Sequence, residues 1–310
     1  MEEPRYQRYM SPFVDYGFYK LFGTETNKEL LISLLNAIFE HLAQQVPDEP
    51  RQVVKDLKYL PAENLAAYGE RRAVFDVCCE GENGEKFIVE IQKASQNFWG
   101  DRSEFYSSFP IIEQVKVGTD CDFYLNNVYT LGILNFKFSG GEYGKDCFHH
   151  EMKLMDVEDK HGNLSAVLST SQTAFYDKLT CVYIEMPKFN KTEAELVSMY
   201  DKWLFVLKNL PCLMDRPVAL HERVFSRLFE QAEIALFSPD WSRNYEESLK
   251  HYRDLRNVIN SAERRGREEG LAEAVQQEKV EEARKMKELG LATGLIRQVT
   301  NLSAVEIERL

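Results

Sequence analysis

The sequence predicts an α/β (α+β) fold in which helices flank a β-sheet, with an all-helical region at the C-terminus. Two alternating runs between residues 74 and 92 are separated by Asn83-Gly84, which is the pattern of a β-hairpin. The elements predicted around this hairpin follow the order helix, three strands, helix, strand. From Thr192 onward the composition turns helical.

The first elements are two helices and a strand. Asp15 is a preferred capping residue and Gly23 a preferred helix end, so a short helix is expected between them. An apolar stripe with helical spacing predicts a second helix over residues 28–44. Residues 53–59 are typical of a strand that Pro61 ends, because proline cannot continue a central ladder.

The apolar pattern sets the register of the hairpin. Pairing residues whose numbers add up to 166 gives one apolar face: Phe75 with Ile91, Val77 with Val89, and Cys79 with Phe87. The opposite face then pairs Asp76 with Glu90, Glu80 with Lys86, and Val74 with Gln92. This register needs a three-residue loop over 82–84, with Gly84 in the left-handed conformation. A two-residue loop would mix polar and apolar residues on each face, so we reject it.

The pairing of Asp76 with Glu90 suggests a metal site. Directly opposed residues have Cβ atoms roughly 5 Å apart, and two carboxylates that close repel each other. Either one takes up a proton or a cation lies between them. With Gln92 beside them, the oxygen atoms suit Mg²⁺ or Mn²⁺. The alternative is a solvated strand face that is acidic for structural reasons.

Further elements complete the predicted sheet. Residues 98–117 indicate a helix with a possible kink at Pro110, ending at Gly118. Residues 128–138 form an apolar run typical of a buried strand. The segments 120–147 and 164–189 are expected to add strands.

The C-terminal third is predicted to be helical throughout. Helices are expected over 193–209, 218–236 and 242–262, separated at Pro211, Pro217 and Pro239. Charges of alternating sign over 262–290 favour an exposed helix or a loose coiled coil, and Gly290 ends it. Two short helices follow, over 291–299 and 303–310, and we favour a self-associating tail over a helix-turn-helix because no basic recognition face is visible. The regions expected are 1–190, 191–262 and 263–310.

Composition narrows the class of protein. The sequence shows no signal-peptide pattern and no apolar run that approaches a membrane span. Six cysteines without a C-x-x-C spacing predict reduced thiols and a cytoplasmic protein. The net charge of -12 argues against a broad nucleic-acid footprint but leaves room for a local basic groove or a bound metal.

The chain resembles a known family over nearly its whole length. An Asp on one strand and Glu-x-Gln on the next resemble the signature of the PD-(D/E)XK nucleases. The opening DYGFYKLFG and the later segments YLPAE, VYTLGILNFKF, YIEMPKF and DKWLFVLKNL follow the order of the recombination-promoting nuclease (Rpn-type) transposase family. The resemblance implies a restriction-endonuclease-like core, with a mixed sheet flanked by helices, that hydrolyses DNA phosphodiester bonds.

The resemblance also implies roles for the residues of the hairpin. Asp76 and Glu90 match the metal ligands, and the main-chain carbonyl of Ile91 would complete the shell. Gln92 takes the position that most of the superfamily gives to lysine, and its amide would hold water or a phosphate oxygen. Lys93 follows on the opposite face, so we expect it to be a poor substitute.

Residues outside the hairpin are weaker candidates. Asp15 matches the acidic position of the opening motif and is either a third acid or a helix cap. Lys20 is retained from that motif as a phosphate candidate, whereas Tyr19 replaces the preceding lysine. Arg102 and Tyr106 lie four apart on one helix face and can reach phosphate, unless Arg102 pairs with a neighbouring acid in solvent.

Two further polar positions favour ordinary explanations. His149 and His150 are adjacent in a predicted loop and have no partner at the spacing of a metal ligand set, so we expect them to be solvated. Glu185 is expected to be a surface residue at a strand end.

The sequence therefore predicts a metal-dependent DNA endonuclease linked to recombination or mobile elements, with Mg²⁺ or Mn²⁺ as cofactor. DNA is the expected partner, no membrane is involved, and the C-terminal tail is expected to support homo-oligomers. A nuclease fold that has lost catalysis and only binds DNA or protein is the alternative. A self-associating scaffold that works through its charged tail is a third possibility.

Overall fold

The chain forms two units. The computed structural model describes residues 7–45, 52–61, 63–64, 73–94, 99–115, 124–137, 147–155 and 174–310. The core unit spans Met1–Leu249 and the tail unit spans Lys250–Leu310. The boundary falls inside one long helix, α6 (Pro239–Glu288). We describe each unit by itself.

A mixed sheet of six described strands organises the core unit, and its order is β1-β4-β5-β6-β8-β7. The strands are β1 (Leu57–Tyr59), β4 (Val77–Gly81), β5 (Lys86–Gln92), β6 (Val128–Leu134), β7 (His149–Met155) and β8 (Ala174–Glu185). The three central strands β5, β6 and β8 run parallel, and the outer pairs are antiparallel. A separate short pair joins β2 (Glu63–Asn64) to β3 (Ala73–Val74). The predicted α/β class with a mixed sheet is confirmed.

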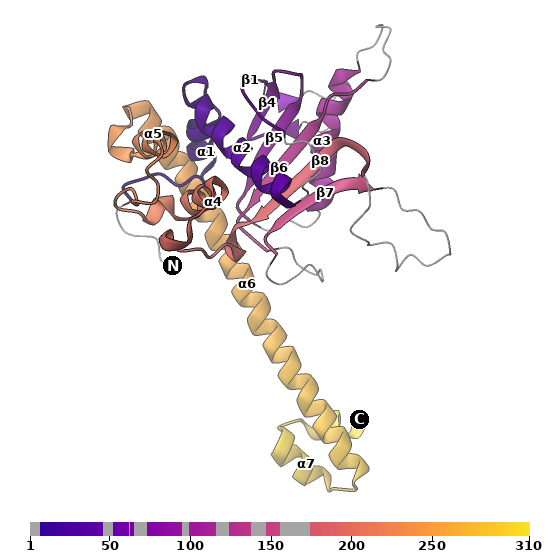
Figure 1. The fold of residues 1–310 in the computed structure, drawn as a ribbon. Coiled ribbons are helices and arrows are strands. Elements are labelled where there is room, and N and C mark those ends of the chain that lie inside the picture. The colour runs from indigo at the N-terminus through magenta and orange to yellow at the C-terminus, as the bar shows by residue number, and fades with distance from the viewer. Residues whose placement is uncertain are drawn as a thin grey trace. The chain divides into compact units, whose positions relative to one another are not determined.

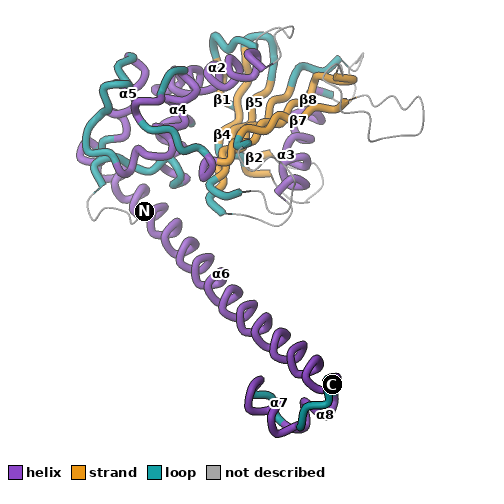
Figure 2. Tube along the Cα trace, turned by 60° about the horizontal axis from the view of Figure 1, so that its bottom comes forward, coloured by secondary structure: helices purple, strands orange, loops and turns teal. Residues whose placement is uncertain are grey.

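Helices cover both faces of this sheet (Figures 1 and 2). One face packs against α2 (Lys28–Gln45), whose Phe39 ring lies 4.9 Å from that of Tyr129 and 6.0 Å from that of Phe87. This helix is joined in its layer by α1 (Asp15–Phe22), α4 (Met199–Asn209) and α5 (Arg223–Ala232). The other face packs against α3 (Trp99–Gln114) through side chains of β4, β5, β6 and β8.

The hairpin adopts the predicted register over its regular part. Val77 pairs with Val89, Cys79 with Phe87, and Glu80 with Lys86, so each pair adds up to 166. The loop is the predicted three-residue one, since the Gly81 N–H donates to the Glu85 carbonyl at 2.8 Å. Gly84 has φ 84°, the left-handed conformation that this loop requires.

Phe75 departs from the predicted face. β4 starts at Val77, and the chain bends at Asp76 immediately before it. Phe75 therefore does not pair with Ile91 but joins the buried cluster of Cys78 and Ile88 under α3. Its ring meets that of Tyr106 edge-on at 5.5 Å. The predicted alternation holds only where the ladder continues, and at the bend the large ring packs against α3 instead.

Gly132 on β6 allows α3 to approach the sheet closely. It pairs in register with Glu90 of β5 and Tyr183 of β8. A Cβ atom at this position would lie 2.9 Å from the Tyr183 ring and 3.1 Å from the Trp99 ring. Because glycine has no side chain, Trp99 can rest on the strand at the N-terminal end of α3.

Several predicted boundaries are wrong. The first strand begins at Leu57 rather than residue 53, and α5 is shorter than the predicted helix over 218–236. The capping box at Thr192 exists, but it starts a 3-10 turn over Glu193–Glu195, and α4 begins at Met199 behind a second capping box formed by Ser198 and Asp201. Pro110 lies inside α3, and the predicted ends of that helix at residues 98 and 116–118 fall outside the described residues.

The predicted separation near residue 262 is also wrong. Pro239 occupies the first position of α6, where its missing N–H costs nothing, and the helix continues to Glu288. Gly266 and Gly270 are accommodated within it. Gly290, with φ 76°, then follows the end of the helix as predicted.

The tail unit has a small hydrophobic core of its own. The end of α6 packs against α7 (Thr293–Thr300) and α8 (Ala304–Arg309). Its buried members are Ala283, Ile296, Leu302 and Ile307. The predicted capping box at Ser303 and Glu306 starts α8, with the Ser303 side chain accepting from the Glu306 N–H at 3.3 Å.

Candidate active site

The two predicted acids meet at the end of the β4–β5 pair. The Asp76 N–H donates to a Glu90 side-chain oxygen at 3.2 Å. The Asp76 carboxylate accepts from the Ile91 N–H at 2.7 Å. Because β4 starts only at Val77, this carboxylate takes the place that a further backbone acceptor would have held in the ladder. The structure thus brings Asp76, Glu90 and Ile91 together, but Asp76 lies just before the β4–β5 ladder and does not form the predicted strand pair with Glu90.

Burial and mutual repulsion make these acids hard to ionise. Glu90 is only 2% exposed. Burial, and then the nearby Asp76 charge, raise the pKa of Glu90 to about 8. Burial likewise raises the pKa of Asp76 to about 6, against the lowering effect of its hydrogen bond from Ile91. The pair thus favours a bound proton or a bound cation at neutral pH.

Gln92 and the Ile91 backbone extend the set of oxygen atoms. The Gln92 amide nitrogen donates to the second Glu90 oxygen at 3.2 Å, and the side chain is buried. The Gln92 carbonyl accepts from the Asn135 N–H at 2.8 Å, so its backbone points toward β6. Successive strand residues point their backbone groups to alternate sides, and the Ile91 backbone therefore faces the Asp76 side.

Asp15 also lies beside the acid pair, but not as a cap. Val14 precedes α1 in the capping position, and no side chain caps this end. Asp15 is in the first turn and forms an ion pair with Lys93, with 2.5 Å between Asp15 Oδ1 and Lys93 Nζ. Its negative charge contributes to the raised pKa of Asp76. The helix-cap interpretation is wrong, whereas the third-acid interpretation agrees with this placement.

Positive charges flank the acids. Arg102 on α3 lies over the rings of Tyr106 at 4.8 Å and Trp99 at 5.9 Å. Its charge lowers the pKa of both Asp76 and Glu90, and the Lys93 charge lowers that of Asp76. Arg102 is thus oriented by aromatic rings and acts on the acids.

Two phosphate candidates are placed in aromatic surroundings. Tyr106 packs against the cluster that contains Phe75. The Lys20 ammonium lies 4.5 Å from the ring centroid of Phe237 and 4.6 Å from that of Trp241. Burial lowers the pKa of Lys20. This geometry gives Lys20 a packing role on the α1 side of the core unit, and a phosphate contact by Lys20 stays a prediction.

The donor set fits a hard divalent cation. In the part of the chain that the structure describes, no group of three or more His, Cys, Asp and Glu side chains is arranged around a metal position. Mg²⁺ is commonly held by one or two carboxylates and keeps several waters, so two acids and a backbone carbonyl suffice. Burial is the main cause of the raised pKa values of Asp76 and Glu90, and the Asp76 charge adds to that of Glu90, so a bound cation would offset the cost of ionising both acids.

A family model for PD-(D/E)XK nuclease family transposases matches residues 12–262. The chain belongs to this family. The match includes the hairpin, both flanking helical layers and the acids at its end. PD-(D/E)XK nucleases generally use divalent metal ions, which agrees with the chemistry of the acid pair. No curated protein and no solved structure matched the chain.

Three polar residues of the core unit differ from their predicted settings. Glu185 is fully buried at the end of β8, not on the surface, and one of its oxygens lies 2.7 Å from both His150 Nε2 and Lys188 Nζ. His149 and His150 lie on β7, not in a loop. His149 contacts the Tyr200 hydroxyl at 2.5 Å, and burial lowers the pKa of His149 to about 3. Glu185 and His150 thus join β8 to β7, and His149 joins β7 to α4.

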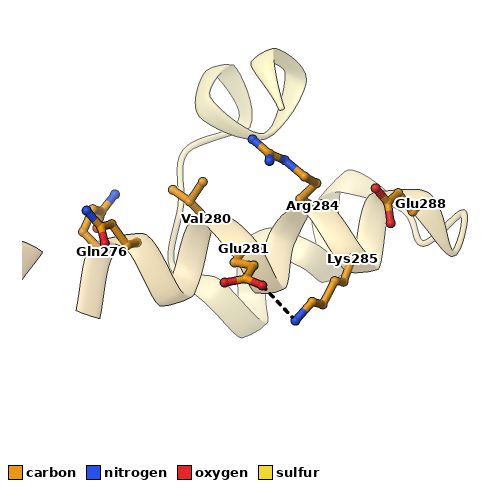
Figure 3. Close-up of a pocket in the computed structure, with 7 residues that line it drawn as sticks. Gln276, Val280, Glu281, Arg284, Lys285 and Glu288 are labelled. Atoms are coloured by element: carbon orange, nitrogen blue, oxygen red, sulfur yellow. Dashed lines mark ion pairs between the residues drawn. The ribbon is translucent and has the colours of Figure 1, made fainter. Parts of the chain in front are cut away.

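The tail unit has a pocket of its own (Figure 3). Its lining residues all come from α6: Gln276, Gln277, Val280, Glu281, Arg284, Lys285 and Glu288. Glu281 and Lys285 form an exposed ion pair at 3.2 Å. None of these side chains is buried or brought against a second acid in the manner of Glu90, so we assign no reaction to this pocket.

Sequence reasoning missed the contribution of Lys93. Alternation along β5 places Lys93 on the opposite side from Gln92. There Lys93 forms its ion pair with Asp15 of α1. The expectation that Lys93 is a poor substitute for lysine at position 92 stays a prediction, although its charge lowers the pKa of Asp76. The related signal in the sequence is Asp15, the acidic residue of the opening motif.

No described helix carries an apolar stretch long enough to cross a bilayer. The described cysteines, Cys78, Cys79, Cys147, Cys181 and Cys212, are all free thiols, which agrees with the prediction for these five.

Proposed function

We propose that this chain is a Mg²⁺-dependent DNA endonuclease that hydrolyses phosphodiester bonds. The observation that carries the proposal is the contact of the half-buried Asp76 with the buried Glu90, two acids whose pKa values are raised, at the end of the hairpin of a PD-(D/E)XK nuclease family transposase. Acids that are costly to ionise without a cation are typical of functional sites.

Each residue of the site has a role in this proposal. Asp76, Glu90 and the Ile91 carbonyl hold Mg²⁺, with Mn²⁺ as the related alternative. A bound divalent ion polarises the phosphate and offsets charge on the attacking and leaving oxygens. Gln92 already donates to Glu90, so its side-chain oxygen is the atom that accepts a hydrogen bond from the attacking water. Arg102 offsets negative charge on the phosphate from the α3 side.

DNA is the proposed partner, bound locally at this site rather than over a broad surface. The net charge of -12 disfavours an extended electrostatic footprint. The residues at the strand ends, Arg102 and the bound metal then have to provide most of the attraction for the DNA phosphates. We accordingly expect weak, metal-dependent binding. Self-association through the tail unit stays a prediction.

Plasmid nicking in the presence of Mg²⁺ tests the proposal. Asp76→Ala and Glu90→Ala should abolish nicking, whereas the parent nicks. Glu80→Gln is the matched control, because Glu80 is an acid of the same hairpin that pairs with Lys86. Equal nicking by the parent and both alanine variants would show that the catalytic assignment is wrong.

One observation favours the non-catalytic alternative. Gln92 carries no positive charge at the position where most of the superfamily has lysine, and it is engaged with Glu90. A nuclease fold that only binds DNA would bind duplex DNA in a Mg²⁺-dependent manner without any nicking. Measuring binding and nicking on the same preparation separates the two functions.

A further inference from the structure

The acid site contains a buried ammonium group that the family pattern does not place there. Lys93 follows directly after β5, and its side chain is only 10% exposed. Its Nζ lies 2.5 Å from Asp15 Oδ1, and Asp15 comes from the first turn of α1. An ion pair thus joins the C-terminal end of β5 to the helix that carries the opening motif.

This ion pair lies close to Asp76 along β5. The Asp76 carboxylate accepts from the Ile91 N–H at 2.7 Å, and Lys93 follows Ile91 by two residues. In agreement with this placement, the Asp15 charge raises the pKa of Asp76 and the Lys93 charge lowers it. Arg102 on α3 also lowers the pKa of Asp76, so one cation from the end of β5 and one from α3 act on this carboxylate.

The chemistry of the site leaves a role for Lys93. Phosphodiester hydrolysis develops negative charge on the phosphate oxygens, and a positioned ammonium stabilises that charge. Gln92 cannot provide this charge, because an amide is neutral. An ammonium has three N–H donors, so Lys93 can keep Asp15 as one partner and still donate to a phosphate oxygen.

We infer that Lys93 contacts the scissile DNA phosphate and that Asp15 positions it for this contact. The inference rests on the proposed function and deepens it. Lys93 takes over, from the adjacent position and the other side of β5, the charge that Gln92 lacks. Asp15 is then a positioning residue rather than a metal ligand.

The first experiment compares Lys93→Met with Lys93→Arg and with the control Lys86→Met. Lys86 is a matched control, since it also lies on β5, is 13% exposed and pairs with an acid, Glu80. Two quantities are measured: the nicking rate in Mg²⁺, and the salt dependence of binding to a 20-base-pair duplex in Ca²⁺, which provides a hard divalent cation for binding. The melting temperature of each variant is recorded alongside them.

The expected result is a change confined to the methionine variant at position 93. Its nicking rate should fall by about 100-fold. The slope of log Kobs against log salt concentration should become shallower by about one, as for the loss of one phosphate contact. Lys93→Arg should keep the slope and most of the rate, because it keeps the charge. Lys86→Met should change neither.

The salt slope decides the inference whether or not the parent cleaves DNA. An unchanged slope in Lys93→Met overturns it, even if the rate falls. If the parent shows no nicking, the proposed hydrolysis fails, but a slope that changes only in Lys93→Met still supports the phosphate contact. A lowered melting temperature that Lys93→Arg does not restore also overturns it, because the role is then structural.

A double-mutant cycle assigns the role of Asp15. If Asp15 acts only through Lys93, then Asp15→Asn should lower the nicking rate in the parent but add nothing in the Lys93→Met background. Mn²⁺ affinity, measured by calorimetry, should stay within about twofold in both backgrounds. A loss of Mn²⁺ affinity of tenfold or more on Asp15→Asn would instead make Asp15 a metal ligand and overturn its positioning role.

Discussion

Acidic residues behave differently in the core unit and in the tail unit. Glu90 is buried at 2% exposure, opposes a second acid and has a pKa raised to about 8. Glu281 on α6 has a side chain that is 70% exposed and pairs with Lys285 one helical turn away. Such an exposed pair contributes little to stability. The comparison teaches that burial and a like-charged neighbour, rather than the number of acids, raise the pKa of a carboxylate.

The largest expected effect is the difference in plasmid nicking between a variant of Glu90 and a variant of Glu281. Glu90→Gln should reduce Mg²⁺-dependent nicking by about 100-fold or more, because it removes a charged ligand. Glu281→Gln should leave nicking within about twofold, since its charge is solvated. Plasmid nicking under identical conditions measures both. An equal loss of nicking in the two variants would contradict this difference, because α6 would then take part in the reaction.

The next effect concerns the stability of the tail unit. Ile296→Ala should destabilise the packing of α7 on α6 by about 3 kcal/mol, because Ile296 is buried in the small tail core. Amide exchange of residues 280–310 should accelerate accordingly, while nicking stays unchanged. A loss of nicking would show that the tail unit supports the site in the core unit.

A smaller effect follows from the raised pKa values. Both acids must release a proton to bind a cation, so Mn²⁺ affinity should increase by up to about tenfold per pH unit from pH 6 to pH 8. Without metal, the folded state holds its protons more tightly than the unfolded state. The contribution of Glu90 to the free energy of unfolding should therefore be fully present below its ordinary pKa of 4.5 and be lost as the pH rises to about 8.

Calorimetry and urea unfolding at several pH values measure these two dependences. Glu90→Gln should flatten both curves, and Glu281→Gln should leave both as in the parent. A Mn²⁺ affinity that does not change between pH 6 and pH 8 would contradict the coupling between the acids and the cation.

The smallest effect is a helix cap in the tail unit. Ser303→Ala removes the side chain that accepts from the Glu306 N–H and should destabilise α8 by about 1 kcal/mol. Chemical shifts of residues 303–309 should then move toward random-coil values. No change in these shifts would mean that packing of Ile307 alone holds α8.

The hairpin was predictable because one turn and one apolar face determined it. The glycine at position 84 and the alternating residues of β4 and β5 left a single register. The same logic failed at Phe75, since alternation is a property of a continuing ladder and the chain bends at Asp76. It also gave no information on Lys93, whose partner Asp15 lies 78 positions earlier in the sequence.

The buried polar residues were harder to predict than the acids of the hairpin. Glu185 and His150 form a contact between neighbouring strands, β8 and β7, and this pairing depends on the strand order. Pro239 correctly marked the separation between α5 and α6, whereas the change to alternating charges near residue 262 was misleading, since α6 continues to Glu288. Local patterns predicted the type of each element, whereas tertiary packing decided where several of them begin.

Gly132 has no functional group, but it affects how closely Arg102 approaches Asp76 and Glu90. Its bare backbone lies between Glu90 and Tyr183, and the Trp99 indole rests in the space that a methyl group would fill. Arg102 lies less than one helical turn beyond Trp99, so the thickness of one carbon atom on β6 sets how near that guanidinium comes to the acids. A side chain at position 132 would therefore displace Trp99 and, with it, the arginine charge from the acids.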